Sequence, residues 1–251
     1  TFGFFINILI PKLIIVILKS NTLALITARS GSKRLKNKNL LDFKGKPLIA
    51  WTIIEALNSK YIDEVIISTD DEQIADISKT FGGSVLFKRP KNLAEDKSSS
   101  ISVVHHSIQE LEKNNKFYEH LILLQPTSPL RKSYHIDEAV ELYNNHNADC
   151  LISISEATDI NQMKNFLCTD ENSKEYIKFN NLQTSDMKSL NKFRINGALY
   201  LVKIDLMQNQ NSIILKSNTF AYIMDTMFSI DIDTESDFRL AEQIIKNSPV
   251  S

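Results

Sequence analysis

An alternation of short apolar runs with longer amphipathic stretches, from residue 23 to residue 154, constrains the fold of this chain more than any other feature. The apolar runs have the length of buried strands, and the stretches between them have the length of helices. Strands are expected at 23–28, 64–69, 84–87, 120–125 and 150–154, and helices at 47–57, 72–81, 98–113 and 134–146. This order predicts an α/β fold with a mostly parallel sheet and helices on both faces.

The alternation stops after residue 154, where the chain becomes rich in Asn, Ser, Asp and Lys. We interpret residues 155–220 as an excursion from the main sheet, in the form of a small lobe or a dimerisation arm. The excursion contains short strand-like pieces such as 176–179. Residues 196–202 are expected to form a return strand, 221–224 another strand, and 235–245 a closing helix. Residues 23–251 are therefore expected to form one domain.

Residues 4–18 are almost entirely apolar, but Asn7 and the Pro11-Lys12 pair interrupt them. A membrane-spanning helix needs about 20 apolar residues, and a signal peptide has a basic start and a small-residue cleavage site. The segment matches neither pattern, so we expect residues 1–22 to be an extension outside the functional domain. A weak membrane attachment through residues 1–18 and a packed element remain alternatives.

The charge balance argues against a general polyanion-binding surface. The chain has 29 Lys and Arg against 30 Asp and Glu, for a net charge of -1. Binding to nucleic acid or to an anionic membrane is therefore not expected, and any anion site must be local. The cysteines, Cys150 and Cys168, lack metal-ligand spacing and suit a reducing compartment such as the cytoplasm.

A local anion site is indicated by the loop after the first expected strand, within the sequence ALITARSGSKRLKNKN at residues 24–39. This loop carries five cations and no acid: Arg29, Lys33, Arg34, Lys36 and Lys38. Its Ser-Gly-Ser segment at 30–32 lets backbone N–H groups approach a ligand closely. The loop suits a polyphosphate, although charge alone would favour a solvated basic turn.

Two further segments are expected at the same edge of the sheet, because the carboxyl ends of parallel strands meet there. The first is QPTSPLR at 125–131, which either contacts a sugar or base through its polar side chains or only initiates a helix. The second is RPKNLAEDKSSS at 89–100, whose serines either cap a helix or bind the edge of a nucleobase. The sequence leaves both pairs of alternatives open.

An aspartate pair near the carboxyl terminus is a candidate metal site. Asp231 and Asp233 stand two residues apart in a strand-like alternation, which would point both carboxylates to the same side. Carboxylate oxygens in this arrangement suit Mg²⁺, which keeps several waters and bridges to substrate phosphates. Asp233 could instead cap the last helix.

Taken in order, these motifs resemble the acylneuraminate cytidylyltransferases, which include the CMP-sialic acid synthetases. The series is the basic loop, Arg89-Pro90, QPTSPLR, R-x-NGA at 194–198 and DID-T-E-x-D at 231–237, and it covers about residues 23–245. The resemblance implies a Rossmann-like nucleotidyltransferase fold, usually in a homodimer. It also implies a reaction that joins CTP to a nine-carbon 2-keto sugar acid, with Mg²⁺, and releases pyrophosphate.

The resemblance assigns a role to each matching residue. Arg29, Lys33 and Lys38 would contact the triphosphate, with Lys38 on the leaving-group side, and Asp231 would act in catalysis together with Arg29 and Lys38. The other roles are nucleotide binding by Asn39, cytosine binding by Arg89, Ser98 and Ser100, sugar binding by Gln125, Arg194 and Asn196, and Mg²⁺ binding by Asp231 and Asp233.

The resemblance leaves the sugar undecided between N-acetylneuraminate and a relative such as legionaminate. Sialate-specific members often carry an Arg-Gln pair shortly before R-x-NGA, where this chain has Asp186 and Met187. The QPTSPLR turn argues against the pseudaminic acid branch, which tends to have an Ala-Pro version. Two other classes remain as alternatives: a glycosyltransferase, in which D-x-D usually falls mid-chain, and a non-catalytic nucleotide-binding homologue.

Overall fold

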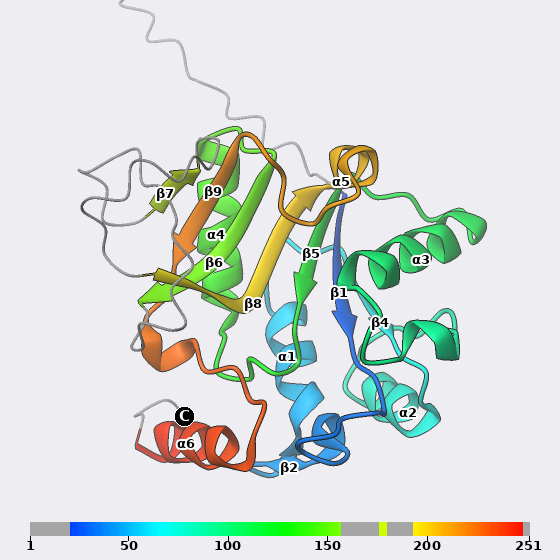
Figure 1. The fold of residues 1–251 in the computed structure, drawn as a ribbon, viewed down its shortest axis with the longest axis vertical. Helices are drawn as coiled ribbons and strands as arrows, with labels where there is room; N and C mark the ends of the chain where they lie inside the picture. The colour runs from blue at the N-terminus through cyan, green and yellow to red at the C-terminus, as the bar shows by residue number, and fades with distance from the viewer. Residues whose placement is uncertain (1–20, 157–175, 180–192, 248–251) are drawn as a thin grey trace, which may run out of the picture.

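The computed structural model describes residues 21–156, 176–179 and 193–247 (Figure 1). Within these residues the main sheet has seven strands in the order β4-β1-β5-β8-β6-β9-β7. The main-sheet strands are β1 (Thr22–Thr27), β4 (Glu64–Ser68), β5 (His120–Leu124), β6 (Cys150–Glu156), β7 (Tyr176–Phe179), β8 (Phe193–Lys203) and β9 (Thr219–Ile223). A separate hairpin pairs β2 (Asp42–Phe43) with β3 (Lys46–Pro47). Residues 1–20 of the expected extension, Cys168, Asp186 and Met187 lie outside the described residues, whereas Thr22 of the extension belongs to β1.

The expected helices at 47–57, 72–81, 98–113, 134–146 and 235–245 all form, with ends shifted by at most two residues, whereas the helix at 204–210 was not expected. They are α1 (Leu48–Leu57), α2 (Glu72–Thr80), α3 (Ser100–Lys113), α4 (Ser133–Asn145), α5 (Ile204–Gln210) and α6 (Glu235–Asn247), with short 3₁₀ turns η1 (Lys38–Leu40), η2 (Lys91–Leu93) and η4 (Thr226–Phe228). Asp71 caps α2 by accepting a hydrogen bond from the Ile74 N–H at 3.0 Å. Ser99 caps α3 in the same way, so neither Ser98 nor Ser100 serves as its cap.

Helices cover both faces of the sheet, as expected. On one face α1 and α4 bury side chains such as Ile53 and Val140 against the strands. On the other face α3 and α5 do the same with side chains such as Val104 and Met207. Parallel pairs join β1 to β4, β1 to β5 and β6 to β9, so the predicted mostly parallel α/β sheet is confirmed. None of the helices in the described part of the chain is long and apolar enough to cross a membrane.

The central strand β8 runs antiparallel to both of its neighbours, β5 and β6. Its register places Leu199 opposite Leu124, so β8 begins at the edge of the sheet where β5 ends. The range 155–220, interpreted as an excursion, must therefore be revised, because residues 193–203 form the middle of the main sheet. Ala198, Leu201 and Val202 are at most 1% exposed, and burial of this apolar run favours a central position. Residues 157–175 and 180–192 of that range lie outside the described residues.

The strand that was expected at 84–87 does not form. Only an isolated bridge joins Ser84 to Ile66 of β4. Val85 then packs against the core on one face of the sheet and Phe87 against the core on the other. Side chains two residues apart would share a face in a strand, so this segment instead wraps around the sheet edge.

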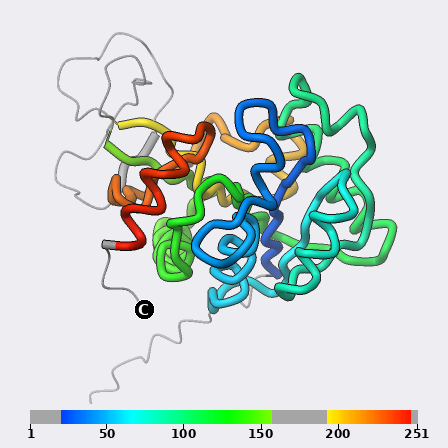
Figure 2. Tube along the Cα trace, turned by 90° about the horizontal axis from the view of Figure 1, so that it is seen from below, coloured from blue at the N-terminus to red at the C-terminus, as the bar shows by residue number. Residues whose placement is uncertain are grey.

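A third apolar cluster attaches α6 to the carboxyl edge of the sheet. Phe43, Leu130, Phe238 and Ala241 pack together there, and Leu35 of the basic loop joins them. Figure 2 looks onto this edge, where the early loop (blue) and α6 (red) lie on either side of the segment that follows β5 (green). The cluster thus brings the beginning and the end of the chain to one place.

Candidate active site at the carboxyl edge of the sheet

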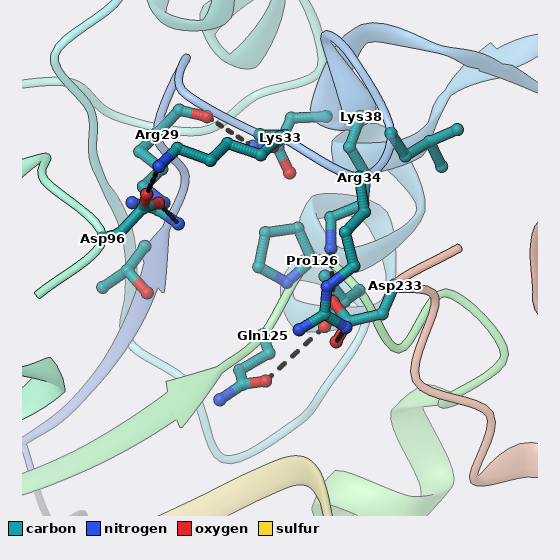
Figure 3. A pocket seen from close by; sticks show the side chains of 13 residues that line it. Arg29, Lys33, Arg34, Lys38, Asp96, Gln125, Pro126 and Asp233 are labelled. Atoms are coloured by element: carbon teal, nitrogen blue, oxygen red, sulfur yellow. Dashed lines mark hydrogen bonds and ion pairs between the residues drawn. The ribbon is translucent and has the colours of Figure 1, made fainter. Parts of the chain in front are cut away.

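A pocket of about 450 Å³ opens at this edge, between the basic loop, the end of β5 and the start of α6 (Figure 3). Among the described residues that line it are four cations, two carboxylates and one amide at the end of β5: Arg29, Lys33, Arg34, Lys38, Asp96, Asp233 and Gln125. The cations divide into two pairs, and each pair holds one carboxylate. We call these the Asp96 wall (Arg29, Lys33 and Asp96) and the Asp233 wall (Arg34, Lys38 and Asp233).

In the Asp96 wall, one carboxylate bridges two cations of the basic loop. Arg29 Nη2 lies 2.7 Å from Asp96 Oδ1, and Lys33 pairs with Oδ2 of the same carboxylate. Hydrogen bonds from Lys33 and then Arg29 hold the pKa of Asp96 below its usual range. The Lys33 side chain is 81% exposed and that of Asp96 39%, so solvent screens this ion pair strongly.

The basic loop is held in shape from below by Asp70, at the end of β4. Asp70 accepts the Ser30 N–H at 3.1 Å and the Ser30 hydroxyl at 2.7 Å. Asn39, which is 5% exposed, donates from Nδ2 to the Arg29 carbonyl at 3.0 Å. The loop is therefore preorganised, and four of its five cationic side chains line the pocket.

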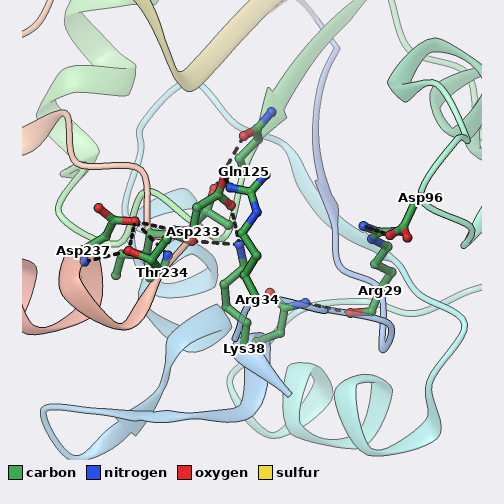
Figure 4. Close-up of polar contacts among 11 residues, drawn as sticks. Arg29, Arg34, Lys38, Asp96, Gln125, Asp233, Thr234 and Asp237 are labelled. Carbon is green, nitrogen blue, oxygen red and sulfur yellow. Dashed lines mark hydrogen bonds and ion pairs between the residues drawn. The ribbon is translucent and has the colours of Figure 1, made fainter. Parts of the chain in front are cut away.

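In the Asp233 wall, Lys38 is nearly enclosed. Its side chain is 12% exposed, and Nζ donates to Asp233 Oδ1 at 2.9 Å and to the Ile232 carbonyl at 2.7 Å. Arg34 Nη1 donates to the other oxygen of Asp233 at 3.1 Å (Figure 4). Arg34 thus lines the pocket and pairs with an acid, whereas Lys36 is not among the lining residues.

Packing of Ile232 fixes the two aspartates. Ile232 is fully buried in the third apolar cluster, and its N–H donates to the Thr127 carbonyl at 2.8 Å. The strand-like alternation of Asp231 and Asp233 does not correspond to a strand, because none forms at residues 229–234. Asp233 is also not the helix cap. Thr234 and Asp237 cap α6 reciprocally, with Asp237 accepting the Thr234 N–H at 2.7 Å, which leaves the Asp233 carboxylate facing the pocket.

Asp231 lies behind the pocket lining, where Thr127 donates a hydrogen bond to its carboxylate. Its Oδ1 atom is buried and has no hydrogen-bond partner within the described residues. Burial raises the pKa of Asp231; the bond from Thr127 opposes the shift, and the negative charge of Asp233 reinforces it. A buried carboxylate oxygen without a partner carries a desolvation penalty that a cation would relieve.

The two aspartates fit a divalent cation that completes its shell with water and phosphate. The described residues contain no group of three or more His, Cys, Asp or Glu side chains that could hold a metal by itself. Mg²⁺ does not need such a group, because one or two carboxylates and substrate phosphates suffice. The free Oδ1 of Asp231 and the pocket-facing carboxylate of Asp233 supply that donor set.

A second, smaller pocket adjoins the first, and Arg29 and Asp96 line both. The predicted cytosine residues Arg89, Ser98 and Ser100 line this second pocket. Arg89 is 4% exposed, and its guanidinium donates to the hydroxyl and the carbonyl of Ser68. Burial lowers the pKa of Arg89 to about 10. Ser98 donates its hydroxyl to the Asn92 carbonyl at 2.8 Å.

Of the three residues expected to bind the sugar, only Gln125 lines the main pocket. The backbone of β8 approaches it closely at Gly197, where an added Cβ would lie 3.1 Å from Gln125 Oε1. Asn196 is 2% exposed and bonded to Ser153 and Ser229, and Arg194 donates to the Ser229 carbonyl at 3.2 Å. The structure therefore brings Arg194 and Asn196 to the same edge but not into the pocket lining.

Sequence reasoning missed three charged residues of this site: Asp70, Asp96 and Arg34. It assigned no individual role to any of the three: Arg34 was only one of the five loop cations, and Asp96 was only a member of the 89–100 segment. The absence of an acid inside the basic loop was a usable signal, because four pocket cations need counter-ions from elsewhere in the chain.

An α/β sheet whose carboxyl edge presents such a cation-lined pocket has the architecture of a nucleotide-binding protein. The family model "Cytidylyltransferase" matches residues 23–248. The chain is 36% identical over 234 residues to an N-acylneuraminate cytidylyltransferase of Escherichia coli O18:K1:H7, covering 89% of this chain and 52% of that protein. It is 32% identical over 224 residues to a pseudaminic acid cytidylyltransferase of Campylobacter jejuni, covering 89% and 96%. The chain belongs to the cytidylyltransferase family and is a nucleotidyltransferase.

A solved structure confirms the fold. A CMP:2-keto-3-deoxy-manno-octonic acid synthetase complexed with CTP superposes with a TM-score of 0.69 and 18% identity, covering 90% of this chain and 99% of that one. The predicted Rossmann-like nucleotidyltransferase fold is therefore confirmed. The chain spans about half the length of the Escherichia coli relative.

Proposed function

We propose that this protein transfers CMP from CTP to the anomeric hydroxyl of a nine-carbon 2-keto sugar acid, such as N-acetylneuraminate or legionaminate, and releases pyrophosphate. The observation that carries the proposal is the pocket itself. Four cations and two carboxylates meet there, at the end of β5 and next to a second pocket of a size to hold a base. The family membership and the named activities of the relatives support it.

The proposed reaction is an in-line displacement at the α-phosphorus. The anomeric oxygen forms a bond to phosphorus, the bond from phosphorus to the β-phosphate oxygen breaks, and the hydroxyl proton leaves to water. Negative charge grows on the departing pyrophosphate, where Arg29, Lys33 and Lys38 would offset it. Because Asp233 already holds Lys38 and Asn39 already holds the loop backbone at Arg29, little reorganisation of these groups accompanies that charge movement.

Asp231 and Asp233 would hold Mg²⁺, with the phosphates of the nucleotide completing its coordination. When bound, the ion would offset phosphate charge and lower the pKa of the attacking hydroxyl. Asp231 contributes a buried oxygen with no other partner, and Ile232 fixes the spacing of the two carboxylates. Gln125 would orient the sugar acid, and Arg89, Ser98 and Ser100 would surround the cytosine.

The test is pyrophosphate release from CTP and Mg²⁺ with a panel of nine-carbon sugar acids that includes N-acetylneuraminate, legionaminate and pseudaminate. We expect release with one member well above the level without sugar. No release with any member, from folded protein, would disprove the proposal. A glycosyltransferase would instead consume CMP-sugar, and a non-catalytic homologue would bind CTP without turnover. Sedimentation equilibrium tests the homodimer that the resemblance implies.

A further inference from the structure

The Asp96 wall contains an acid that opposes the function proposed for its cations. Arg29 and Lys33 would bind phosphate, yet Asp96 already occupies both with its two carboxylate oxygens. A triphosphate that reached the same two side chains would meet the negative charge of Asp96 at close range. One of the two anions must therefore give way.

Asp96 can give way without loss of fold, because its contacts are solvent-exposed. Its side chain is 39% exposed, and Lys33 is 81% exposed. Exposed ion pairs of this kind are weak. By contrast, Lys38 in the Asp233 wall is 12% exposed and is also bonded to the Ile232 carbonyl.

Asp96 also lies where the two pockets meet. It lines both, together with Arg29, and it belongs to the segment that carries Glu95 and Ser98 of the second pocket. Arg29 is tied to the same segment by a bond from Nη1 to the Ala94 carbonyl at 3.3 Å. A ligand that fills both pockets therefore gains contacts in the second while it displaces Asp96 from the first. A ligand made of phosphate alone gains none.

We propose that Asp96 is an internal anion that competes with phosphate for Arg29 and Lys33 and so limits the affinity of the site for free pyrophosphate, which has no base to anchor it. The inference deepens the proposed function and rests on it. Before transfer, the base anchors the phosphates against this competition. After transfer, pyrophosphate is no longer attached to the base, and Asp96, at high effective concentration, replaces it on the two cations.

The experiment compares binding of pyrophosphate and of CTP, by calorimetric titration of the full chain, in wild type, Asp96→Asn and Glu112→Gln. Glu112 is the control for the loss of one negative charge, because it is exposed on α3, lines neither pocket and has no ion pair among the described residues. We expect Asp96→Asn to bind pyrophosphate and CTP each about tenfold more tightly, because both ligands displace the same carboxylate. Glu112→Gln should change both affinities by less than about twofold.

Two results would overturn the inference: unchanged or weaker pyrophosphate binding in Asp96→Asn, or an equal gain in Glu112→Gln. Thermal unfolding of each variant shows that the fold is kept. The titrations contain no sugar acid and need no turnover, so they separate the two proposals. Failure to form any CMP-sugar would disprove the proposed function but would leave the pyrophosphate comparison to be judged on its own result.

Discussion

The Asp96 wall and the Asp233 wall share one pattern of charges but differ in their surroundings. Each has one carboxylate that bridges two cations of the same loop, Arg29 and Lys33 in one case and Arg34 and Lys38 in the other. In the Asp96 wall the segment around the acid is exposed. In the Asp233 wall the acid follows Ile232, which is fully buried.

Because of this difference, a ligand can replace Asp96 in its ion pairs, whereas the ion pairs of Asp233 are held in place by packing. Water screens the ion pairs of Asp96, so a competing anion can replace the carboxylate. The partners of Asp233 are fixed by the packing of Ile232 and by the cap of α6, so they keep their geometry when a ligand arrives. The same ion-pair motif thus suits release on one side of the pocket and positioning on the other.

The largest expected effect is at Asp231, behind the Asp233 wall. We expect Asp231→Asn to lower turnover by about 10³-fold, because it removes a proposed metal ligand. Stability should not fall, because the lost charge is a buried carboxylate with an unpartnered oxygen. Pyrophosphate release and urea unfolding provide the two measurements. Activity within about tenfold of wild type would contradict the proposed role of Asp231 as a metal ligand.

Lys38 and Arg34 both pair with Asp233, but we expect the substitution of Lys38 to lower activity more than that of Arg34. Lys38→Met is expected to lower kcat/KM by about 10²-fold or more, because the enclosed ammonium faces the departing phosphates. Arg34→Met, at a side chain that is 71% exposed, should lower it by about tenfold or less. Lys36→Met serves as the control and should have no effect. Equal losses at Lys38 and Arg34 would contradict the argument from burial.

Ser30→Ala tests how far the Asp96 wall depends on the anchor beneath it. The change removes the 2.7 Å bond from the Ser30 hydroxyl to Asp70. We expect a loss of about 1 kcal/mol in the free energy of unfolding and a small rise in KM for CTP with kcat unchanged. Urea unfolding and steady-state kinetics measure the two effects. Ser32→Ala, in the same loop, should leave stability unchanged.

The smallest expected effect is that of pH on the competition between Asp96 and pyrophosphate for Arg29 and Lys33. The pKa of Asp96 lies below its usual range, so its ion pairs are complete above about pH 4 and weaken only as the pH falls further. The ratio of pyrophosphate dissociation constants between wild type and Asp96→Asn should therefore stay constant from pH 6 to pH 8. A ratio that changes by more than about threefold would assign the competition to another group.

The local pattern of the sequence was enough to predict most of the helices and strands. It failed where the structure of a segment depends on contacts with residues far away in the chain. Periodicity located α1 to α4 and the strands they connect, because burial of one face repeats along the chain. It could not show that β8 enters the sheet between β5 and β6, since that depends on strand pairing across more than 70 residues. The strand expected at 84–87 failed for a related reason, because Val85 and Phe87 find cores on opposite faces.

The candidate site divides in the same way. The residue types of the basic loop and the order of the motifs indicated a phosphate site and its family. Asp96 and Asp70 could not be assigned, because their partners Arg29 and Ser30 lie 67 and 40 residues away, and no local spacing links them. The aspartate pair was found from its spacing, but its different surroundings were not, because they follow from the packing of Ile232.

By itself, the sequence determined the alternation that builds an α/β sheet and the cations that follow its first strand, because hydrophobic periodicity and charge are local properties. The tertiary structure alone decided which acid each cation meets and how much water reaches the pair. Ion pairs depend on distance and on screening by solvent, and both are set by the packing of segments that the chain order keeps apart.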